Sequence, residues 1–178
     1  MKQILRYGLI LFLVCSISAG VLAFTYENTQ RVIESNRKKE KERILKEIIP
    51  EATDFKKVEN PPKSDSNLVK ITEVYIAYKG NEKTGTVWEV TSKGYSSDIL
   101  MIIGTNKEGK ISHITILSQQ ETPGLGTEIV KDSFLNQFIG RDTPNLEVKK
   151  NVTPVSGATI SSSAIVRAVN EVLKHKNF

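Results

Sequence analysis

A long apolar run stands near the N-terminus of this sequence. From Tyr7 to Tyr26 the chain reads YGLILFLVCSISAGVLAFTY, which is 20 residues without a formal charge. A helix that rises about 1.5 Å per residue crosses the hydrocarbon core of a bilayer, about 30 Å, in this length. Aromatic residues at both ends suit the two membrane interfaces. The pattern predicts one transmembrane helix over residues 7–26, behind a cytoplasmic N-terminus of residues 1–6.

A cleaved signal peptide is the alternative interpretation of the same segment. Lys2 and Arg6 precede the apolar core, and Val21-Leu22-Ala23 resembles a cleavage site. The apolar run is longer than a usual signal core, which favours an anchor. Lys2 and Arg6 favour a cytoplasmic N-terminus, whereas five basic residues between 31 and 41 favour the opposite orientation. Because long domains cross membranes largely regardless of charge, we expect the domain after the span on the extracytoplasmic side.

The segment after the span is polar and rich in helix formers. Residues 27–49 place apolar side chains at loosely helical spacing, and Pro50 ends the pattern. We interpret residues 27–58 as a charged helical stalk and linker, whose basic run can contact anionic lipid headgroups. The sequence ENPPKSDS at 59–66 is typical of a loop. A domain of residues 59–178 follows.

Short runs of β-type residues begin this domain, at 69–78, 86–91, 99–103 and 111–117. Turn residues lie between them at 80–85 and 106–109, and the last two runs form a predicted hairpin.

Helical spacing replaces this pattern in the C-terminal part. It predicts a helix over 129–139 that ends at Gly140, and a final helix over 161–174 whose first serines act as N-caps. Residues 146–150 form a possible short strand. Strands followed by helices predict an α+β fold. The whole chain is therefore one N-terminal transmembrane helix followed by a mixed α/β domain.

Charge and composition narrow the possible functions. The net charge is 25 − 20 = +5, and residues 1–46 alone contribute it, with nine Lys or Arg against four acids. Residues 47–178 are therefore neutral, which argues against a nucleic-acid-binding surface on the domain. One cysteine and two histidines are too few for a disulfide framework, an iron–sulfur cluster or a histidine-built metal centre.

The first motif with chemical potential follows the predicted hairpin. It consists of Glu121, Thr122, Pro123, Gly124, Leu125 and Gly126. Proline fixes one backbone angle and the glycines permit unusual ones, so the loop can bring backbone amides close to a flat or anionic ligand. A tight turn that leads into a helix explains the same residues without a ligand.

The second motif precedes the final helix and reads VSGATISSS from Val155 to Ser163. Small residues allow a ligand to approach the backbone, and the N-terminus of the helix favours a phosphate. Thr159 would place a hydroxyl next to that phosphate. A serine-rich N-cap without a ligand is the equally simple alternative.

The two motifs together resemble those of a known family. SGAT, preceded by ETPGLG about 30 residues upstream and by Gly94-Tyr95 before the hairpin, is similar to the FMN-binding domain of flavoprotein electron-transport subunits. The resemblance covers the anchor and residues 93–174. It is strongest to the G subunits of Rnf ion-translocating complexes, and extends to the C subunits of sodium-translocating NADH:quinone reductases.

The resemblance implies a cofactor and its attachment point. FMN would be joined through its phosphate to the Thr159 hydroxyl as a phosphoester, made by a separate flavin transferase that uses FAD and magnesium. The phosphate end would be lined by Ser156, Gly157, Ala158, Ile160 and Ser161. Residues 121–126 would form part of the flavin pocket, with Leu125 as an apolar contact. Thr153 departs from the family pattern, which commonly has an acidic residue there.

The resemblance also implies a role and partners. The chain would be an electron carrier with no catalytic residue, no metal ligand and no independent turnover, in a bacterial or archaeal plasma membrane. Its partners would be the other membrane, iron–sulfur and flavin subunits of an Rnf-type complex, which couples ferredoxin:NAD electron transfer to export of Na⁺ or H⁺. The quinone-reductase C subunit is typically longer than these 178 residues. A membrane-tethered binding module without redox chemistry is the rival from another class, and an enzyme using Glu121 with Asp98 or Asp142 is a third.

Overall fold

The computed structural model describes the backbone of residues 2–176 and 178, and their side chains except at 2–5, 27, 28 and 31–40. The chain divides into two compact units, residues 1–44 and 45–178. Helix α1, Lys2–Ile48, includes the segment Arg6–Tyr26, which is long and apolar enough to cross a membrane and has exposed side chains. The predicted span and stalk are thus parts of one helix. It ends two residues before Pro50, as the restriction on the residue preceding proline requires.

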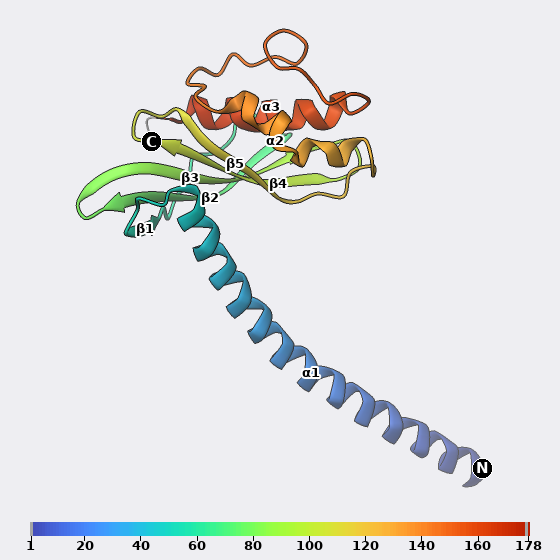
Figure 1. Ribbon diagram of the computed structural model, residues 1–178. Coiled ribbons are helices and arrows are strands. Elements are labelled where there is room, and N and C mark those ends of the chain that lie inside the picture. Colours follow the sequence, from blue (N-terminus) through green and yellow to red (C-terminus); the bar gives the residue numbers. More distant parts are fainter. Residues whose placement is uncertain (1, 177) are drawn as a thin grey trace. The chain divides into compact units, whose positions relative to one another are not determined.

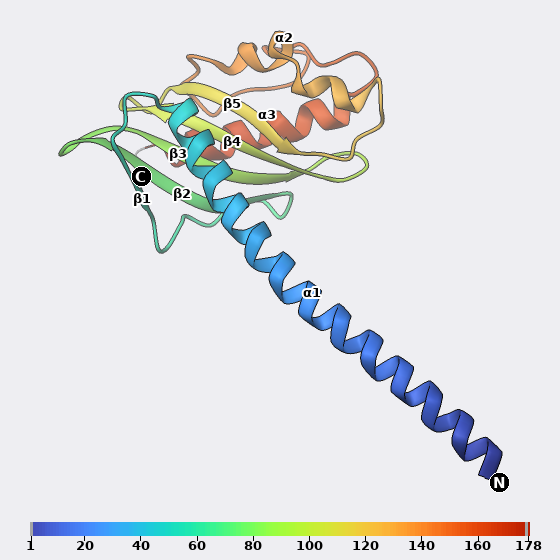
Figure 2. The same cartoon turned by 60° about the horizontal axis from the view of Figure 1, so that its bottom comes forward.

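The second unit contains a five-stranded antiparallel sheet in the order β1-β2-β3-β4-β5 (Figures 1 and 2). The strands are β1 (Asp54–Lys57), β2 (Val69–Lys79), β3 (Glu82–Lys93), β4 (Asp98–Asn106) and β5 (Ile111–Ser118). The four predicted strands and the β4–β5 hairpin are confirmed, and each strand is longer than predicted. The sequence pattern missed β1, a short charged strand that pairs with β2 at the sheet edge and lies before residue 59.

The turn predicted at residues 80–85 is wrong in its second half. Gly80, with a positive φ of 63°, makes the β2–β3 turn, whereas Gly85 is part of β3. A Cβ at Gly85 would lie 2.8 Å from Ile49 Cδ1, and one at Gly104 in β4 would lie 2.5 Å from Ile48 Cγ2. Both glycines therefore serve close packing of residues 48 and 49 on the sheet.

The segment between β5 and the last helix is less regular than predicted. The helix expected over 129–139 is replaced by three short pieces: η1 (Gly126–Val130), α2 (Asp132–Leu135) and η2 (Asn136–Phe138). Lys131 adopts extended backbone angles, which separate η1 from α2, and Ile139 is extended directly after η2. The strand predicted at 146–150 is also wrong. Among the described residues, this segment takes part only in an isolated bridge, which pairs Val148 with Val152.

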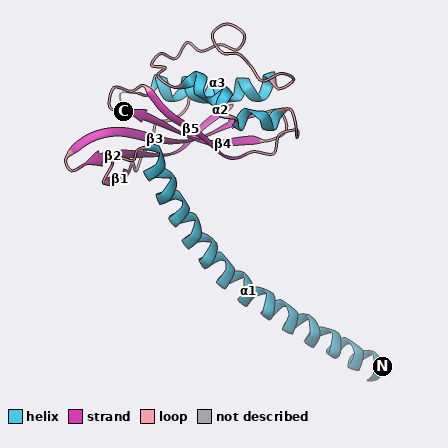
Figure 3. Cartoon of the chain, in the orientation of Figure 1, coloured by secondary structure: helices cyan, strands magenta, loops and turns pink. Residues whose placement is uncertain are grey.

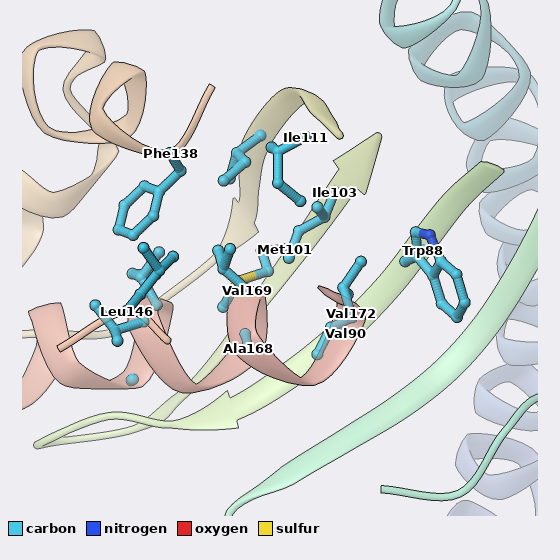
Figure 4. Packing of buried hydrophobic residues seen from close by; sticks show 14 of the residues in the cluster. Trp88, Val90, Met101, Ile103, Ile111, Phe138, Leu146, Ala168, Val169 and Val172 are labelled. Atoms are coloured by element: carbon cyan, nitrogen blue, oxygen red, sulfur yellow. The ribbon is translucent and has the colours of Figure 1, made fainter. Parts of the chain in front are cut away.

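Helix α3, Thr159–Lys174, covers one face of the sheet (Figure 3). Its buried side chains Ala168, Val169 and Val172 point toward apolar residues of β3 and β4, as Figure 4 shows. The opposite face of β3 and β4 buries Val87 and Ile102, and it faces the residues around Ile48. The fold is α+β, as predicted.

Candidate functional site

A cavity of about 570 Å³ lies where the two sequence motifs meet. Its lining consists of Tyr95, Glu121, Thr122, Leu125, Gly126, Gly157, Ala158, Thr159, Ile160 and Ser161. Nine of these ten residues were predicted site residues, and Tyr95 is the addition. Within the described part of the chain, Pro123, Gly124 and Ser156 belong to the same two loops but not to this lining. Folding therefore joins motifs that are about 30 residues apart in the sequence.

Direct contact between the motifs explains why small residues occur in the second one. Gly157 has a positive φ of 75°, and a Cβ placed on it would lie 2.8 Å from Leu125 Cδ2. A larger residue at this position would be strained by its backbone angle and would also displace Leu125. Gly124, at φ 74°, closes the loop, and its N–H donates to Thr127 Oγ1 at 3.0 Å.

The N-terminus of α3 forms one side of the cavity. Its N-cap position is Ala158, and no side chain in the described structure makes a cap hydrogen bond there. The prediction that the serines act as N-caps is wrong. Instead, Ser162 Oγ accepts the Val155 N–H at 3.0 Å, and Ser163 Oγ donates to Thr159 O at 2.8 Å. The first helical N–H groups thus remain available to a ligand, together with the partial positive charge of the helix end.

The rim of the cavity combines a hydroxyl with exposed apolar side chains. Thr159 is exposed in the first turn of α3. Tyr95, Ile160 and Leu125 are exposed by 69%, 50% and 45%. An apolar rim around a positively polarised helix end matches a ligand with a flat ring at one end and an anionic group at the other.

Glu121 is buried at the cavity, whereas the four residues that follow it in the loop, 122–125, are exposed. Its Oε1 accepts the N–H groups of Ser96 and Ser97, both at 3.1 Å. Its Oε2 accepts the Tyr95 N–H at 3.2 Å and the Ser161 hydroxyl at 2.5 Å. Burial raises the pKa of Glu121, but the hydrogen bonds from Ser161, Ser97, Ser96 and Tyr95 outweigh it and hold the pKa below its usual range. The carboxylate is therefore ionised, and both of its oxygens are engaged within the protein.

The contacts of two further residues at the site could not be predicted from the sequence. Gly94 was noted as part of the pattern, and its reason is now visible: a Cβ there would lie 2.5 Å from Glu121 Oε1. Thr153, the position that departs from the family pattern, is held through its backbone by Gln137. The Thr153 N–H donates to Gln137 Oε1 at 2.8 Å, and Gln137 Nε2 donates to the Thr153 carbonyl at 3.1 Å. No local sequence signal identifies this pairing.

Both parts of the chain match known protein families. The FMN-binding domain family matches residues 94–174, and the RnfG N-terminal region matches residues 1–48. In solved structures, the fold is similar to that of NqrC from Shewanella oneidensis, with a TM-score of 0.50, 17% identity and coverage of 73% of each chain. NqrC from Parabacteroides distasonis is similar as well, with a TM-score of 0.50, 19% identity, and coverage of 70% of this chain and 76% of that one.

Proteins similar in sequence over nearly the whole chain are G subunits as well, in agreement with the match to the RnfG N-terminal region. The G subunit of the proton-translocating ferredoxin:NAD(+) oxidoreductase complex of Clostridium ljungdahlii is 31% identical, over 92% of this chain and 86% of the relative. The G subunit of the Na(+)-translocating ferredoxin:NAD(+) oxidoreductase complex of Acetobacterium woodii is 30% identical, over 95% and 89%. The G subunit of the ion-translocating oxidoreductase complex of Methanosarcina acetivorans is 29% identical, over 98% and 95%. The chain belongs to the family of G subunits of the Rnf ion-translocating oxidoreductase complexes.

Proposed function

We propose that this chain is the membrane-anchored FMN subunit of an Rnf-type complex and that it relays electrons within that complex. The complex as a whole would couple ferredoxin:NAD electron transfer to the export of Na⁺ or H⁺, as the names of the relatives describe for those proteins. One observation carries the proposal: the FMN-binding match over residues 94–174 includes every residue that lines the cavity. We infer that the subunit has no turnover of its own.

FMN supplies chemistry that the side chains of this domain lack, since a flavin exchanges electrons one or two at a time. The residues of the chain would bind and orient it. The N–H groups at the start of α3 would donate to the phosphate, and the small residues Gly157 and Ala158 would allow the phosphate to approach the backbone. Leu125 and Ile160 would supply apolar surface to the ring system.

The attachment point in this proposal is the Thr159 hydroxyl. The support is its position: Thr159 is the first residue of α3, is exposed and lines the cavity beside the unpaired helix N–H groups. A separate flavin transferase would move the FMN phosphoryl group from FAD to Thr159 Oγ1 with magnesium, releasing AMP and the hydroxyl proton. Thr159 would then anchor the cofactor and would take no part in electron transfer.

The other residues of the two motifs would support this attachment. Ser156 would contribute to the phosphate end from its loop, and Thr122, Pro123, Gly124 and Gly126 would shape the opposite wall. The Ser161 hydroxyl donates its proton to Glu121 at 2.5 Å. Ser161 would therefore support the site through Glu121.

The proposed location is the plasma membrane, with the FMN domain on the extracytoplasmic side. The segment Arg6–Tyr26 would be the anchor, with Lys2 and Arg6 on the cytoplasmic side. The partners would be the remaining subunits of the complex. The basic run after the span would contact anionic lipid.

The experiment that tests the proposal is the mass of the denatured full-length chain after production with and without a flavin transferase. We expect an increase that matches one FMN phosphoester, located in the peptide that contains Thr159, only when the transferase is present. Thr159→Ala should remove the increase. Ser163→Ala is the matched control, because its hydroxyl is one turn away and bonds to Thr159 O at 2.8 Å. FMN that stays attached to denatured Thr159→Ala protein would refute the assignment. Colourless, unmodified wild-type protein would favour the tethered binding module.

A further inference from the structure

The cavity lining contains a negative charge that no basic side chain of the lining balances. In the part of the chain that the structure describes, the lining includes one carboxylate, that of Glu121, and no Lys, Arg or His. Arg167 of α3 does not line the cavity, and its Nη2 donates to the Lys93 carbonyl at 2.6 Å. The positive end of α3 would be occupied by the phosphate of FMN. A ring bound in the cavity would therefore lie in the field of an unbalanced anion.

The groups that hold the Glu121 carboxylate are neutral. They are the backbone N–H groups of residues 95–97 and the Ser161 hydroxyl, at distances of 2.5 to 3.2 Å. Such hydrogen bonds stabilise the ionised form but leave its net charge in place. Because Glu121 is only 4% exposed, water and salt screen this charge much less than that of a surface acid.

Packing around the carboxylate fixes the position of the charge. A Cβ at Gly94 would lie 2.5 Å from Glu121 Oε1, and a Cβ at Gly126 would lie 2.6 Å from Glu121 Cβ. The two glycines leave room for this side chain and for no larger neighbour. The negative charge therefore stays at one place in the cavity wall.

We propose that the buried Glu121 carboxylate lowers the reduction potential of FMN attached at Thr159. The inference rests on the proposed function, because it requires FMN in this cavity. Each electron that enters the flavin from a donor adds one negative charge unless a proton follows it, and an ionised carboxylate has no proton to give. Charge close to the ring is one of the means by which a protein tunes a flavin. Glu121 thus favours the passing on of electrons over their retention.

The size of the cavity sets the expected magnitude of the effect. A sphere of 570 Å³ is about 10 Å across, so an added electron would lie within about 10 Å of the carboxylate. At an effective dielectric constant of about 20, two unit charges at this distance change an equilibrium constant by about tenfold. A tenfold change corresponds to about 59 mV for one electron.

The test is a reductive titration of the full-length chain with FMN attached, in detergent at constant pH, with dithionite and a reference dye. Glu121→Gln removes the charge and keeps the shape of the side chain. The equilibrium constant for one-electron reduction should therefore rise about tenfold. Ser161→Ala keeps the charge and removes one of its donors, so the potential should fall by a smaller amount. A merely structural role predicts the same direction for both variants, because each weakens the same hydrogen bond.

Glu128→Gln is the matched control for the loss of one negative charge. Glu128 follows the first motif in η1, does not line the cavity and pairs with Lys131. Its side chain is 35% exposed, so water and Lys131 offset its charge. The potential of this variant should stay close to that of the wild type, and any shift should shrink in high salt. The rise in Glu121→Gln should persist in high salt.

The outcomes separate the inference from the function on which it rests. An unchanged potential in Glu121→Gln, a rise in Ser161→Ala, or an equal rise in Glu128→Gln overturns the inference. If Glu121→Gln attaches no FMN, Ser161→Ala alone decides, and a potential equal to or above that of the wild type overturns the inference. The mass of every sample is measured in parallel. Wild-type protein without attached FMN overturns the proposed function as well, whereas attached FMN with unchanged potentials overturns the inference alone.

Discussion

Removal of the Glu121 carboxylate should destabilise the domain by about 2–4 kcal/mol. Each hydrogen bond to a charged group contributes about 1.5–3 kcal/mol, but water can replace the carboxylate at the part-buried N–H groups of Tyr95 and Ser96, since both residues are exposed. It cannot do so freely at Ser161, which is only 2% exposed. The expected cost of Glu121→Ala is therefore that of one or two such bonds and not of four.

The assay is urea unfolding of the full-length chain in detergent, followed by the fluorescence of Trp88. This is the only tryptophan in the sequence, and it is fully buried, with its Nε1 donating to Thr105 Oγ1 at 3.3 Å. Its emission should shift to the red when the domain unfolds. Glu108→Ala is the control, because this exposed carboxylate pairs with Lys110 in the β4–β5 turn, and its removal should leave the unfolding free energy nearly unchanged.

The pH dependence provides an independent check on the ionised state of Glu121. Its pKa in the folded domain is lowered below that of the unfolded chain, where it is about 4.3. The stabilisation is therefore complete above the unfolded pKa and is lost as the pH falls through the folded pKa. The difference in unfolding free energy between wild type and Glu121→Gln should be constant from about pH 7 to 5 and shrink below about pH 4. Glu171, whose pKa is also lowered, is present in both proteins and cancels.

Two results would refute this reasoning about Glu121. A cost of Glu121→Ala as small as that of the Glu108→Ala control would mean that its hydrogen bonds are replaced by water without loss. A difference between wild type and Glu121→Gln that persists unchanged at acid pH would mean that the carboxylate is not the stabilising species.

Two other substitutions probe contacts that support the site and the sheet. Gly104→Val should cost about 1–3 kcal/mol in the urea assay, because its Cβ would lie 2.5 Å from Ile48 Cγ2; unchanged stability would mean that this packing is loose. Gln137→Ala should cost about 1 kcal/mol and slow the attachment of FMN, because it releases both backbone groups of Thr153 near the motif. Attachment at the wild-type rate, measured by mass over time, would exclude a role for this pairing in maturation.

The sequence predicted those parts of the fold whose signal is local. Alternation of apolar and polar residues identified β2 to β5, and helical spacing identified α3. Gly85 was assigned to a turn, and Gly104 was left outside the predicted strand 99–103. The role of both glycines depends on Ile48 and Ile49, which come from another part of the chain. β1 was missed because a strand of four residues with three charges has no apolar pattern and depends on its pairing with β2.

In the region after β5, the sequence predicted the buried residues but not the course of the backbone. The apolar residues expected on the helix over 129–139 are mostly buried: Ile129, Phe134, Leu135 and Phe138 all belong to the core. Helical spacing therefore identified the core residues correctly and the backbone incorrectly. An extended angle at Lys131 interrupts the helix and another at Ile139 ends it, and neither residue has a side chain that prevents helix formation.

At the site, the sequence predicted which residues meet but not what each one contacts. Serines at the start of α3 suggest capping, yet Ser161 bonds to Glu121 and Ser162 bonds to the Val155 N–H, so the helix end stays open. Neither motif can form the cavity alone, because Gly157 must accommodate Leu125 and Glu121 must reach Ser161. Either motif by itself is compatible with an ordinary turn or helix start. Their joint presence is specific because the two motifs fit each other. The second motif leaves space for Leu125 at Gly157, and its Ser161 supplies the hydroxyl that Glu121 of the first motif accepts.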